Sequence, residues 1–261
     1  MRHFSRMIPE ILTNSTPKYI HCKLHKGYWF YCICFCAMFG CAFHPSTVPK
    51  NENTAFISEN LHNFKHFDAA FDCLHMINLN EFVPNIYIDL RYAGNDNFMH
   101  TPMYPFHTAI AYARKPVAEA LKAVQEALNA KGLSLKIWDA YRPYAVTVAF
   151  WKRVHDERYV ANPANGSGHN RGIAVDVTLV QLHNGMPLDM GTDFDNFTDS
   201  AHGNFSQFPS QILANRKLLQ DIMTTHGFKA LPTEWWHFSW INAANFPVLN
   251  IPFKKMKKIV Q

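Results

Sequence analysis

Two short segments about sixty residues apart constrain this chain more than any other feature. The first runs Ser167-Gly-His-Asn-Arg-Gly-Ile-Ala-Val-Asp176, and the second runs Glu234-Trp-Trp-His237. His169, Asp176 and His237 offer two imidazoles and one carboxylate, and three protein ligands with an open position are the stoichiometry of a catalytic zinc. Glu234 is the kind of nearby carboxylate that can take a proton from metal-bound water. The fold must therefore bring two distant stretches together.

The spacing of His169 and Asp176 predicts a loop that folds back over a strand. Residues 173–180 are almost continuously apolar and β-branched, which is typical of a buried strand. Two side chains seven positions apart on one strand would point to opposite faces. We therefore expect His169 on the incoming loop. Gly168 and Gly172 would permit the bend, because glycine accepts backbone angles that other residues resist.

Each candidate ligand also has a structural interpretation. Asp176 is the only charged residue of its predicted strand, so a metal or a cation such as Arg171 must compensate its burial. A lone Glu-x-x-His is a weak signal, since Glu234 could simply cap the turn after Pro232. Glu234 and His237 can face one metal only if the chain bends between them.

The first 43 residues have the composition of an export signal. Residues 1–27 carry five Lys or Arg against one acid, and the uncharged apolar run 28–43 follows. This layout is typical of a secretory leader, and the run is shorter than the roughly 20 residues of a membrane-spanning helix. Met38-Phe-Gly-Cys41 also resembles a lipoprotein cleavage box, so lipidation of Cys41, simple cleavage and an uncleaved anchor all stay open. We expect an exported protein, periplasmic or attached to the membrane only through its leader.

The body of the chain is nearly neutral. Beyond Cys41 it holds 20 Lys or Arg and 19 Asp or Glu, so the overall excess of positive charge belongs to the leader. This removes the main argument for a nucleic-acid partner. Cys73 is the only cysteine of the body, so no disulfide framework is expected within it.

Hydrophobic periodicity predicts one domain in which strands and helices are mixed. Strands are expected at 86–90, 133–138, 173–180 and 235–240, and helices at 115–130, 145–155 and 210–226. Strands and helices do not alternate strictly, which favours an α+β fold with a mainly antiparallel sheet flanked by helices. Residues 183–210 form a loop, and a loop of this length inside a compact domain is usually functional.

The composition divides the chain into four parts. We predict a secretory leader or lipoprotein signal at 1–43, an N-terminal arm or linker at 44–80, a compact domain at 81–250 and a basic tail at 251–261. The tail holds four lysines, and we expect a solvated end, with contact to an anionic wall polymer or lipid as the alternative.

Several motifs together resemble a known family. Asp139-Ala-Tyr-Arg142-Pro, Ser167-x-His169-x6-Asp176 and Glu234-x-Trp236-His237 closely resemble the zinc D-alanyl-D-alanine dipeptidases of peptidase family M15, the group that includes the vancomycin-resistance dipeptidases. Tyr87–Phe98 is similar to the family's N-terminal signature, and Met190–Asp195 is similar to its substrate-loop motif. The resemblance covers about residues 82–245. It implies the zinc-peptidase fold shared by hedgehog-type signalling domains and D,D-peptidases, and it makes 81–250 a zinc dipeptidase domain.

The resemblance implies catalytic roles for five residues. His169, Asp176 and His237 would hold one zinc ion per chain. Glu234 would be the base that deprotonates zinc-bound water and then protonates the leaving amine. Arg142 would stabilise the negative oxygen of the tetrahedral intermediate, for which the alternative is a surface arginine held by Asp139 or Asp176.

The same resemblance implies four substrate contacts. Asp195 would anchor the free ammonium group, which leaves no room for a longer chain on the amino side. Ser167 would lie near the carboxylate end of the substrate, and Tyr141 and Trp236 would form walls of the pocket.

These roles define the expected function and its alternatives. We expect a zinc dipeptidase that cleaves D-Ala-D-Ala, or a closely related small dipeptide, by attack of zinc-bound water in cell-wall peptide turnover. One alternative is a carboxypeptidase or endopeptidase of the same superfamily acting on intact peptidoglycan. The other is a non-catalytic zinc module that binds wall fragments. The sequence sets neither the preference for D- or L-residues nor the oligomeric state.

Overall fold

The structure is a computed structural model that describes residues 57–58, 72–241 and 246–260. The leader predicted at 1–43 and most of the arm predicted at 44–80 lie outside these described residues. Within the described ranges, no helix combines the length and the apolar character needed to cross a membrane.

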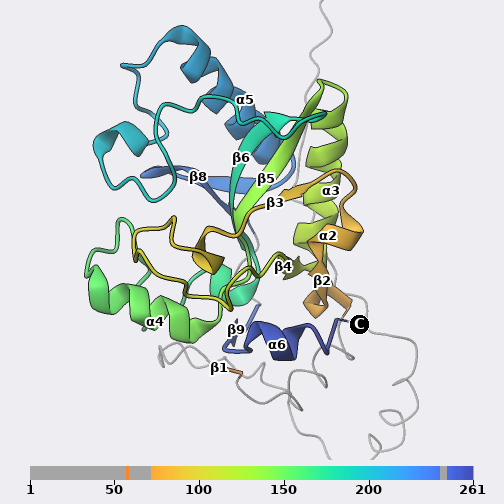
Figure 1. Cartoon of the computed structure of the whole chain (residues 1–261), viewed down its shortest axis with the longest axis vertical. Helices are drawn as coiled ribbons and strands as arrows, with labels where there is room; N and C mark the ends of the chain where they lie inside the picture. The colour runs from red at the N-terminus through yellow and green to blue at the C-terminus, as the bar shows by residue number, and fades with distance from the viewer. Residues whose placement is uncertain (1–56, 59–71, 242–245, 261) are drawn as a thin grey trace, which may run out of the picture.

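A five-stranded sheet organises the domain (Figure 1). Its strands lie in the order β3 (Tyr87–Ile88), β5 (Leu133–Asp139), β6 (Ala174–Gln181), β8 (Glu234–Trp240) and β7 (Phe228–Leu231). β3 pairs with β5 in parallel, and the other three pairings are antiparallel. The predicted α+β class with a mainly antiparallel sheet is confirmed.

Three long helices form close to their predicted positions. They are α3 (Lys115–Asn129), α4 (Tyr144–Arg153) and α5 (Ser210–Thr225). Pro116 stands in the first turn of α3, where its missing N–H costs no hydrogen bond. The buried residues of α3 recur every three or four positions, so one apolar face of this helix packs on the sheet.

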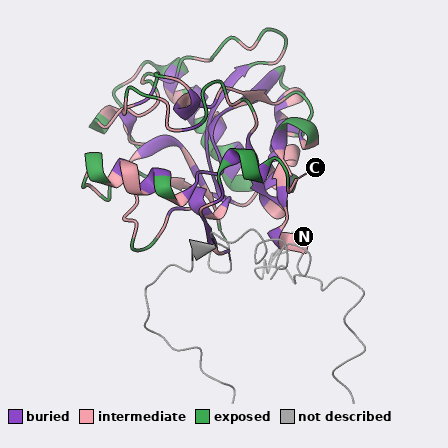
Figure 2. Ribbon diagram, turned by 60° about the horizontal axis from the view of Figure 1, so that its bottom comes forward, coloured by how far each residue is buried: buried purple, intermediate pink, exposed green. Residues whose placement is uncertain are grey.

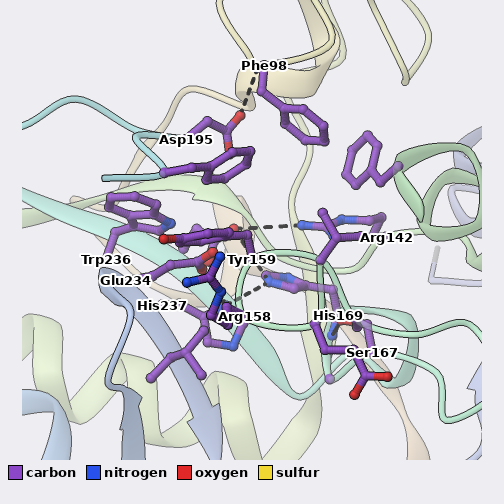
Figure 3. Close-up of a pocket in the computed structure, with 18 of the residues that line it drawn as sticks. Phe98, Arg142, Arg158, Tyr159, Ser167, His169, Asp195, Glu234, Trp236 and His237 are labelled. Atoms are coloured by element: carbon purple, nitrogen blue, oxygen red, sulfur yellow. Dashed lines mark hydrogen bonds and ion pairs between the residues drawn. The ribbon is translucent and has the colours of Figure 1, made fainter. Parts of the chain in front are cut away.

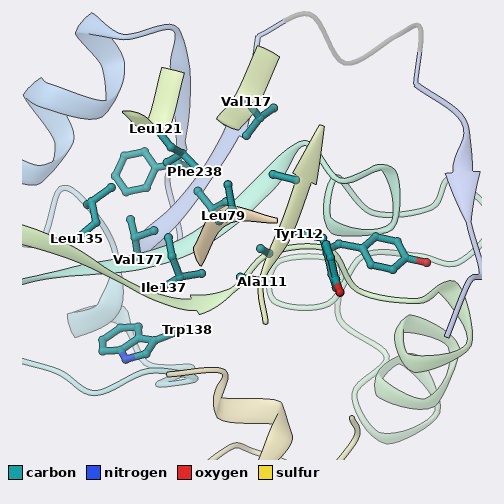
Figure 4. Packing of buried hydrophobic residues seen from close by; sticks show 14 of the residues in the cluster. Leu79, Ala111, Tyr112, Val117, Leu121, Leu135, Ile137, Trp138, Val177 and Phe238 are labelled. Atoms are coloured by element: carbon teal, nitrogen blue, oxygen red, sulfur yellow. The ribbon is translucent and has the colours of Figure 1, made fainter. Parts of the chain in front are cut away.

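The core lies between α3 and the sheet (Figure 4). Leu135 and Ile137 of β5 and Val177 of β6 are fully buried, and they pack with Val117 and Leu121 of α3. All of β6 except its last residue is buried, as its almost continuous apolar sequence predicts. Figure 2 shows the buried strands inside the molecule, with the exposed residues around them.

Short elements extend the domain beyond the predicted boundaries. β2 (Met76–Asn78) pairs with β4 (Tyr112–Arg114), and α2 (Leu79–Phe82) follows β2. β1 (Ile57–Ser58) pairs in parallel with β9 (Val248–Leu249). The packed part of the chain therefore includes residues that the sequence assigns to the arm.

The predicted basic tail is also part of the domain. Ile251, Phe253 and Met256 are buried, the last two in the short helix α6 (Phe253–Met256), while the four lysines face solvent. The apolar residues are spaced so that one side of this segment is buried. The lysines among them make the segment look uniformly polar in the sequence. The expectation of a solvated tail is wrong for residues 251–260.

Cys73 is disulfide-bonded. It is the only cysteine among the described residues.

Candidate active site

Register across three neighbouring strands aligns the first site residues. Asp139 of β5 pairs with Asp176 of β6, and Asp176 pairs with His237 of β8. The β5–β6 register shifts just before Asp139. Paired residues project to the same face of a sheet, so these three side chains form a row.

His169 approaches this row from the preceding loop, as predicted. It begins a 3-10 turn, His169–Arg171, that ends at Gly172 in the left-handed region with φ 71°. Gly168 has ordinary helical angles, so the reason predicted for that glycine is wrong. A Cβ atom at Gly168 would lie 2.9 Å from the Cβ of Ala174, so a close approach requires this glycine.

The potential ligand atoms of His169, Asp176 and His237 all lie within 4.8 Å of one another. Nε2 of His169 is 3.2 Å from Nδ1 of His237, which is 2.9 Å from Oδ1 of Asp176. Two imidazoles and a carboxylate are a donor set that zinc accepts. This cluster can therefore hold a metal ion, as the sequence predicts.

Groups behind the imidazoles orient them toward the cluster. Nδ1 of His169 lies 2.8 Å from the carbonyl of Ala140, to which it donates when Nε2 faces the cluster. Nε2 of His237 lies 3.0 Å from Oγ of Ser239. Hydrogen bonds of this kind fix the tautomer and orientation of metal-binding histidines.

The charges of the cluster suit a cation. Burial opposes ionisation of Asp176, but His169 and His237 outweigh it and hold the pKa of this carboxyl well below its usual range. Burial lowers the pKa of His237, with Asp176 opposing, which favours the neutral imidazole that a metal requires. Arg171 does not compensate Asp176, because its guanidinium binds the carbonyls of Phe246 and Asn165.

Glu234 lies beside the cluster at the start of β8. The β7–β8 pairing shifts between Ala230 and Leu231, which supplies the predicted bend and brings Oε2 of Glu234 to 3.9 Å from Nδ1 of His237. Burial, followed by the charges of Asp176 and Asp195, raises the pKa of Glu234 well above its usual range. A carboxyl with a raised pKa suits the exchange of protons near neutral pH.

Arg142 is a buried residue held by a buried carboxylate. Its Nε and Nη2 lie 2.9 Å and 2.7 Å from Oδ2 of Asp139, and Nη2 lies 3.8 Å from Asp176. Tyr104 donates to the other oxygen of Asp139 at 2.6 Å. The guanidinium also lies over the ring of Phe150, 4.7 Å from its centroid. Arg142 is therefore fixed at the pocket and is not a surface residue.

Asp195 is carried to the pocket by the long loop 183–210. It accepts hydrogen bonds from the Tyr92 hydroxyl at 2.9 Å and the Phe98 backbone N–H at 3.1 Å. Its backbone has φ 57°, a left-handed conformation that Asp tolerates better than most residues. Burial raises the pKa of Asp195 to about 7, although both hydrogen bonds oppose the rise.

These side chains surround a pocket of about 200 Å³ (Figure 3). All but one of the predicted site residues line it: Arg142, Ser167, His169, Asp176, Asp195, Glu234, Trp236 and His237. Ser167 is buried and accepts a hydrogen bond from the backbone N–H of His169 at 3.2 Å. Trp236 forms a wall and packs edge-on against Phe194.

Tyr141 is the exception, and its predicted place in the pocket wall is wrong. Its hydroxyl donates to the carbonyl of Ile251 at 2.9 Å and accepts from the N–H of the same residue at 2.8 Å. Neighbouring side chains of an extended segment point to opposite sides. Because Arg142 faces the pocket, Tyr141 faces the C-terminal segment.

Sequence reasoning missed several residues that shape the pocket. Asp139 fixes Arg142 inside the pocket, whereas the sequence offered this pair only as the surface alternative. Tyr92 and Phe98 hold Asp195 and lie in the N-terminal segment that resembles the family. Arg158 and Tyr159 line the pocket from a loop that no pattern singled out.

A pocket that combines three potential metal ligands with an adjacent buried carboxylate and a fixed arginine is typical of metallohydrolases. A D-alanyl-D-alanine dipeptidase of Escherichia coli (strain K12) is 36% identical over 178 residues, which are 68% of this chain and 91% of that protein. A D-alanyl-D-alanine dipeptidase of Enterococcus faecalis (strain ATCC 700802 / V583) is 30% identical over 182 residues, 63% of this chain and 90% of that protein.

The model of the D-ala-D-ala dipeptidase family matches residues 72–259, so this chain belongs to that peptidase family. The predicted family and enzyme class are confirmed. Among solved structures, the LdcB LD-carboxypeptidase is 24% identical with a TM-score of 0.35, covering 54% of this chain and 65% of that one. This likeness is low, and the family assignment depends on the sequence matches alone.

Proposed function

We propose that this protein is a zinc-dependent dipeptidase that hydrolyses D-Ala-D-Ala or a closely related dipeptide. One observation carries the proposal. The potential ligand atoms of His169, Asp176 and His237 lie within 4.8 Å of one another, and the buried Glu234 stands beside them in one pocket. The names of the sequence relatives support D-Ala-D-Ala as the substrate.

His169, Asp176 and His237 would hold one zinc ion per chain. When bound, zinc would supply Lewis acidity, which polarises a carbonyl group and lowers the pKa of a water ligand to about 7. The hydrogen bonds of His169 to Ala140 and of His237 to Ser239 support this assignment, because they direct one nitrogen of each ring toward the cluster.

Two further side chains would act on the peptide bond. Glu234 would accept a proton from the attacking water and deliver it to the nitrogen of the leaving amine. Arg142, fixed by Asp139, would stabilise the negative charge that develops on the carbonyl oxygen, a contribution on the order of 3 kcal/mol. The burial of both groups supports these roles, since electrostatic interactions are stronger away from water.

Asp195 would make the enzyme a dipeptidase. Its carboxylate lines the pocket and would bind the free ammonium group of the substrate. An ammonium held close to the scissile bond leaves no space for another residue on the amino side. Ser167 and Trp236 would bound the rest of the pocket.

We further propose that the protein is exported by its N-terminal leader and acts on cell-wall-derived dipeptides. The basic, then apolar composition of residues 1–43 supports export. Fractionation of cells that express the full chain would test it, and active enzyme confined to the cytoplasm would contradict it.

The deciding experiment is a panel of D- and L-dipeptides, N-acetylated dipeptides and tripeptides, assayed with zinc and with a chelator. We expect release of D-alanine from D-Ala-D-Ala, loss of activity with the chelator, and no cleavage of N-blocked substrates. The Asp195→Ala variant should lose dipeptide cleavage and keep its zinc. Cleavage of blocked or longer peptides would indicate a carboxypeptidase or endopeptidase. Stoichiometric zinc without any cleavage would indicate a binding module.

A further inference from the structure

The carboxylate end of a dipeptide needs a positive partner, and the pocket offers few. Among the described residues that line it, Arg142 and Arg158 are the only arginines and no lysine is present. Arg142 is buried, and its guanidinium is engaged by Asp139. Four carboxylates line the same pocket: Glu157, Asp176, Asp195 and Glu234. The proposed function assigns Asp195 to the ammonium group and Arg142 to the carbonyl oxygen, so Arg158 is the arginine of the pocket that remains for the substrate carboxylate.

Arg158 is a cation of this kind. Its side chain lines the pocket and is 66% exposed, so a ligand can reach it without any rearrangement of buried residues. Asp156 accepts hydrogen bonds from its Nε and Nη2 at 2.6–3.0 Å. No described residue accepts a hydrogen bond from Nη1, which leaves the edge of the guanidinium formed by Nη1 and Nη2 for a second carboxylate. Asp156 therefore orients the guanidinium of Arg158 and uses only part of its hydrogen-bond donors.

Two contacts hold the loop that carries Arg158 in place. The hydroxyl of Thr233, in the turn before β8, donates to the backbone carbonyl of Arg158 at 2.8 Å. The ring of Tyr159 stacks on Phe197, with centroids 4.8 Å apart and planes 26° apart. The first contact connects Arg158 to the strand of Glu234, and the second connects it to the loop of Asp195. Preorganisation of this kind reduces the entropy lost when a ligand binds.

Figure 3 shows the two charged ends of the pocket apart. Asp195 and Phe98 lie in the upper part of the view, and Arg158 and Ser167 lie in its lower part. A dipeptide whose ammonium group is at Asp195 would extend its carboxylate toward the second end.

We propose that Arg158 binds the C-terminal carboxylate of the dipeptide through the edge of its guanidinium that carries Nη1. This inference rests on the proposed function, and it assigns to Arg158 the selection of substrates with a free carboxylate. Asp195 and Arg158 then recognise the two opposite charges of a zwitterionic dipeptide. Arg158 is a specificity-determining residue and takes no part in proton transfer.

The test compares D-Ala-D-Ala with its C-terminal amide, which differs only in the missing carboxylate charge. For the unmodified enzyme we expect a lower KM for the acid than for the amide. The Arg158→Ala variant should raise the KM for the acid about ten-fold, as expected for one charge-assisted hydrogen bond, and leave kcat within about two-fold. Its KM for the amide should not change. Arg158→Lys should recover part of the preference, since the charge remains but the planar fork does not.

Arg153→Ala is the matched control, because Arg153 is an exposed arginine at the end of α4 that does not line the pocket. Its kinetics should equal those of the unmodified enzyme. If Arg158→Ala changed the KM for the acid and the KM for the amide by the same factor, the proposal would be overturned, and the role of Arg158 would be structural. Unchanged KM values for both would overturn it too.

A binding measurement separates this proposal from the proposed function. In a Glu234→Gln background, isothermal titration with the dipeptide and its amide should show about ten-fold weaker binding of the acid after Arg158→Ala, with the amide unaffected. Equal binding of acid and amide by the protein with Arg158 intact would contradict the carboxylate site. If the enzyme cleaves no dipeptide but shows this preference in binding, the proposed function fails while the role of Arg158 stands.

Discussion

Replacing Asp195 with Asn should make the metal-free protein more stable at neutral pH. The carboxyl is partly buried, and its ionised form is disfavoured there. Asn has nearly the same shape and tolerates the left-handed backbone at this position. Its Oδ1 can accept from the N–H of Phe98, and its Nδ2 can donate to the hydroxyl of Tyr92, which accepts as well as donates. The substitution therefore removes a charge and keeps both contacts of the side chain, with the hydroxyl of Tyr92 accepting from residue 195 where it now donates to it.

The magnitude follows from the pKa of Asp195, which rises from 3.8 to about 7. A difference of about 3 pH units corresponds to about 4 kcal/mol as an upper limit. Solvent reaches part of this side chain and screens its charge, so we expect about 1–2 kcal/mol and a rise in Tm of about 3–6 °C. The folded carboxyl holds its proton more tightly than the unfolded one. The destabilisation is therefore absent below about pH 4, grows between about pH 4 and 7, and is complete above pH 7.

Urea unfolding at pH 5 and pH 8, with a chelator present, measures this effect. The chelator is needed because a divalent cation nearby would lower the pKa of the carboxyl. The Asp195→Asn variant should exceed the unmodified protein in unfolding free energy at pH 8, and less than half of this gain should remain at pH 5. Equal stabilities at pH 8, or a gain that does not depend on pH, would refute the reasoning. The same variant should lose dipeptide cleavage despite its greater stability.

Four other changes test the site and the fold. Glu234→Gln should lower kcat by about 10²–10⁴-fold while dipeptide binding persists, because it removes the proton acceptor; a rate within ten-fold of the original would contradict that role. His237→Ala should abolish stoichiometric zinc in dialysed protein, whereas His226→Ala, whose ring contacts the carbonyl of Ile222 on its own helix, should retain it; zinc retained by His237→Ala would show that the ligand set is wrong. Asp139→Ala should cost about 3–5 kcal/mol in urea unfolding, because it leaves the charge of Arg142 buried without its main partner; a loss below about 1 kcal/mol would mean that water or another group solvates Arg142. Deleting residues 251–261 should lower the free energy of unfolding by about 5 kcal/mol or more, since three buried apolar side chains are lost. An unchanged Tm would mean that this segment is a solvated tail that does not stabilise the domain.

The parts of the site that the sequence predicts well are those with one geometric solution. A strand cannot present His169 and Asp176 on the same face at a separation of seven, so the loop that folds back was the remaining arrangement, and the 3-10 turn before β6 has this form. Glu234 and His237 likewise required a bend, and the register shift between β7 and β8 supplies it. The three long helices were predictable because their apolar residues recur with the period of a helix.

The parts that the sequence does not predict depend on long-range packing. Tyr141 is adjacent to Arg142, and only the position of Ile251 decides that its hydroxyl has a partner away from the pocket. The lysines of α6 conceal Phe253 and Met256, whose burial depends on the rest of the core. Arg158 lies on a loop with no periodic pattern, and its place at the pocket depends on contacts with other loops.

Strand register explains why residues so far apart in the sequence converge. Asp176 faces both Asp139 and His237 across its two neighbouring strands. A slip of one residue in the pairing of β6 with β8 would turn the pairing partner of Asp176 to the other face of the sheet and separate the ligands. The apolar sequence of β6 is buried on both faces, so its own hydrophobicity distinguishes the two registers only weakly. A Cβ atom at Gly168 would lie 3.4 Å from Oγ of Ser239 on β8, and the N–H of Trp240 on β8 donates to the carbonyl of Ile173 at 2.8 Å, so both contacts are specific to one register. The contacts that place His169 over the sheet therefore also favour the register on which the ligand cluster depends.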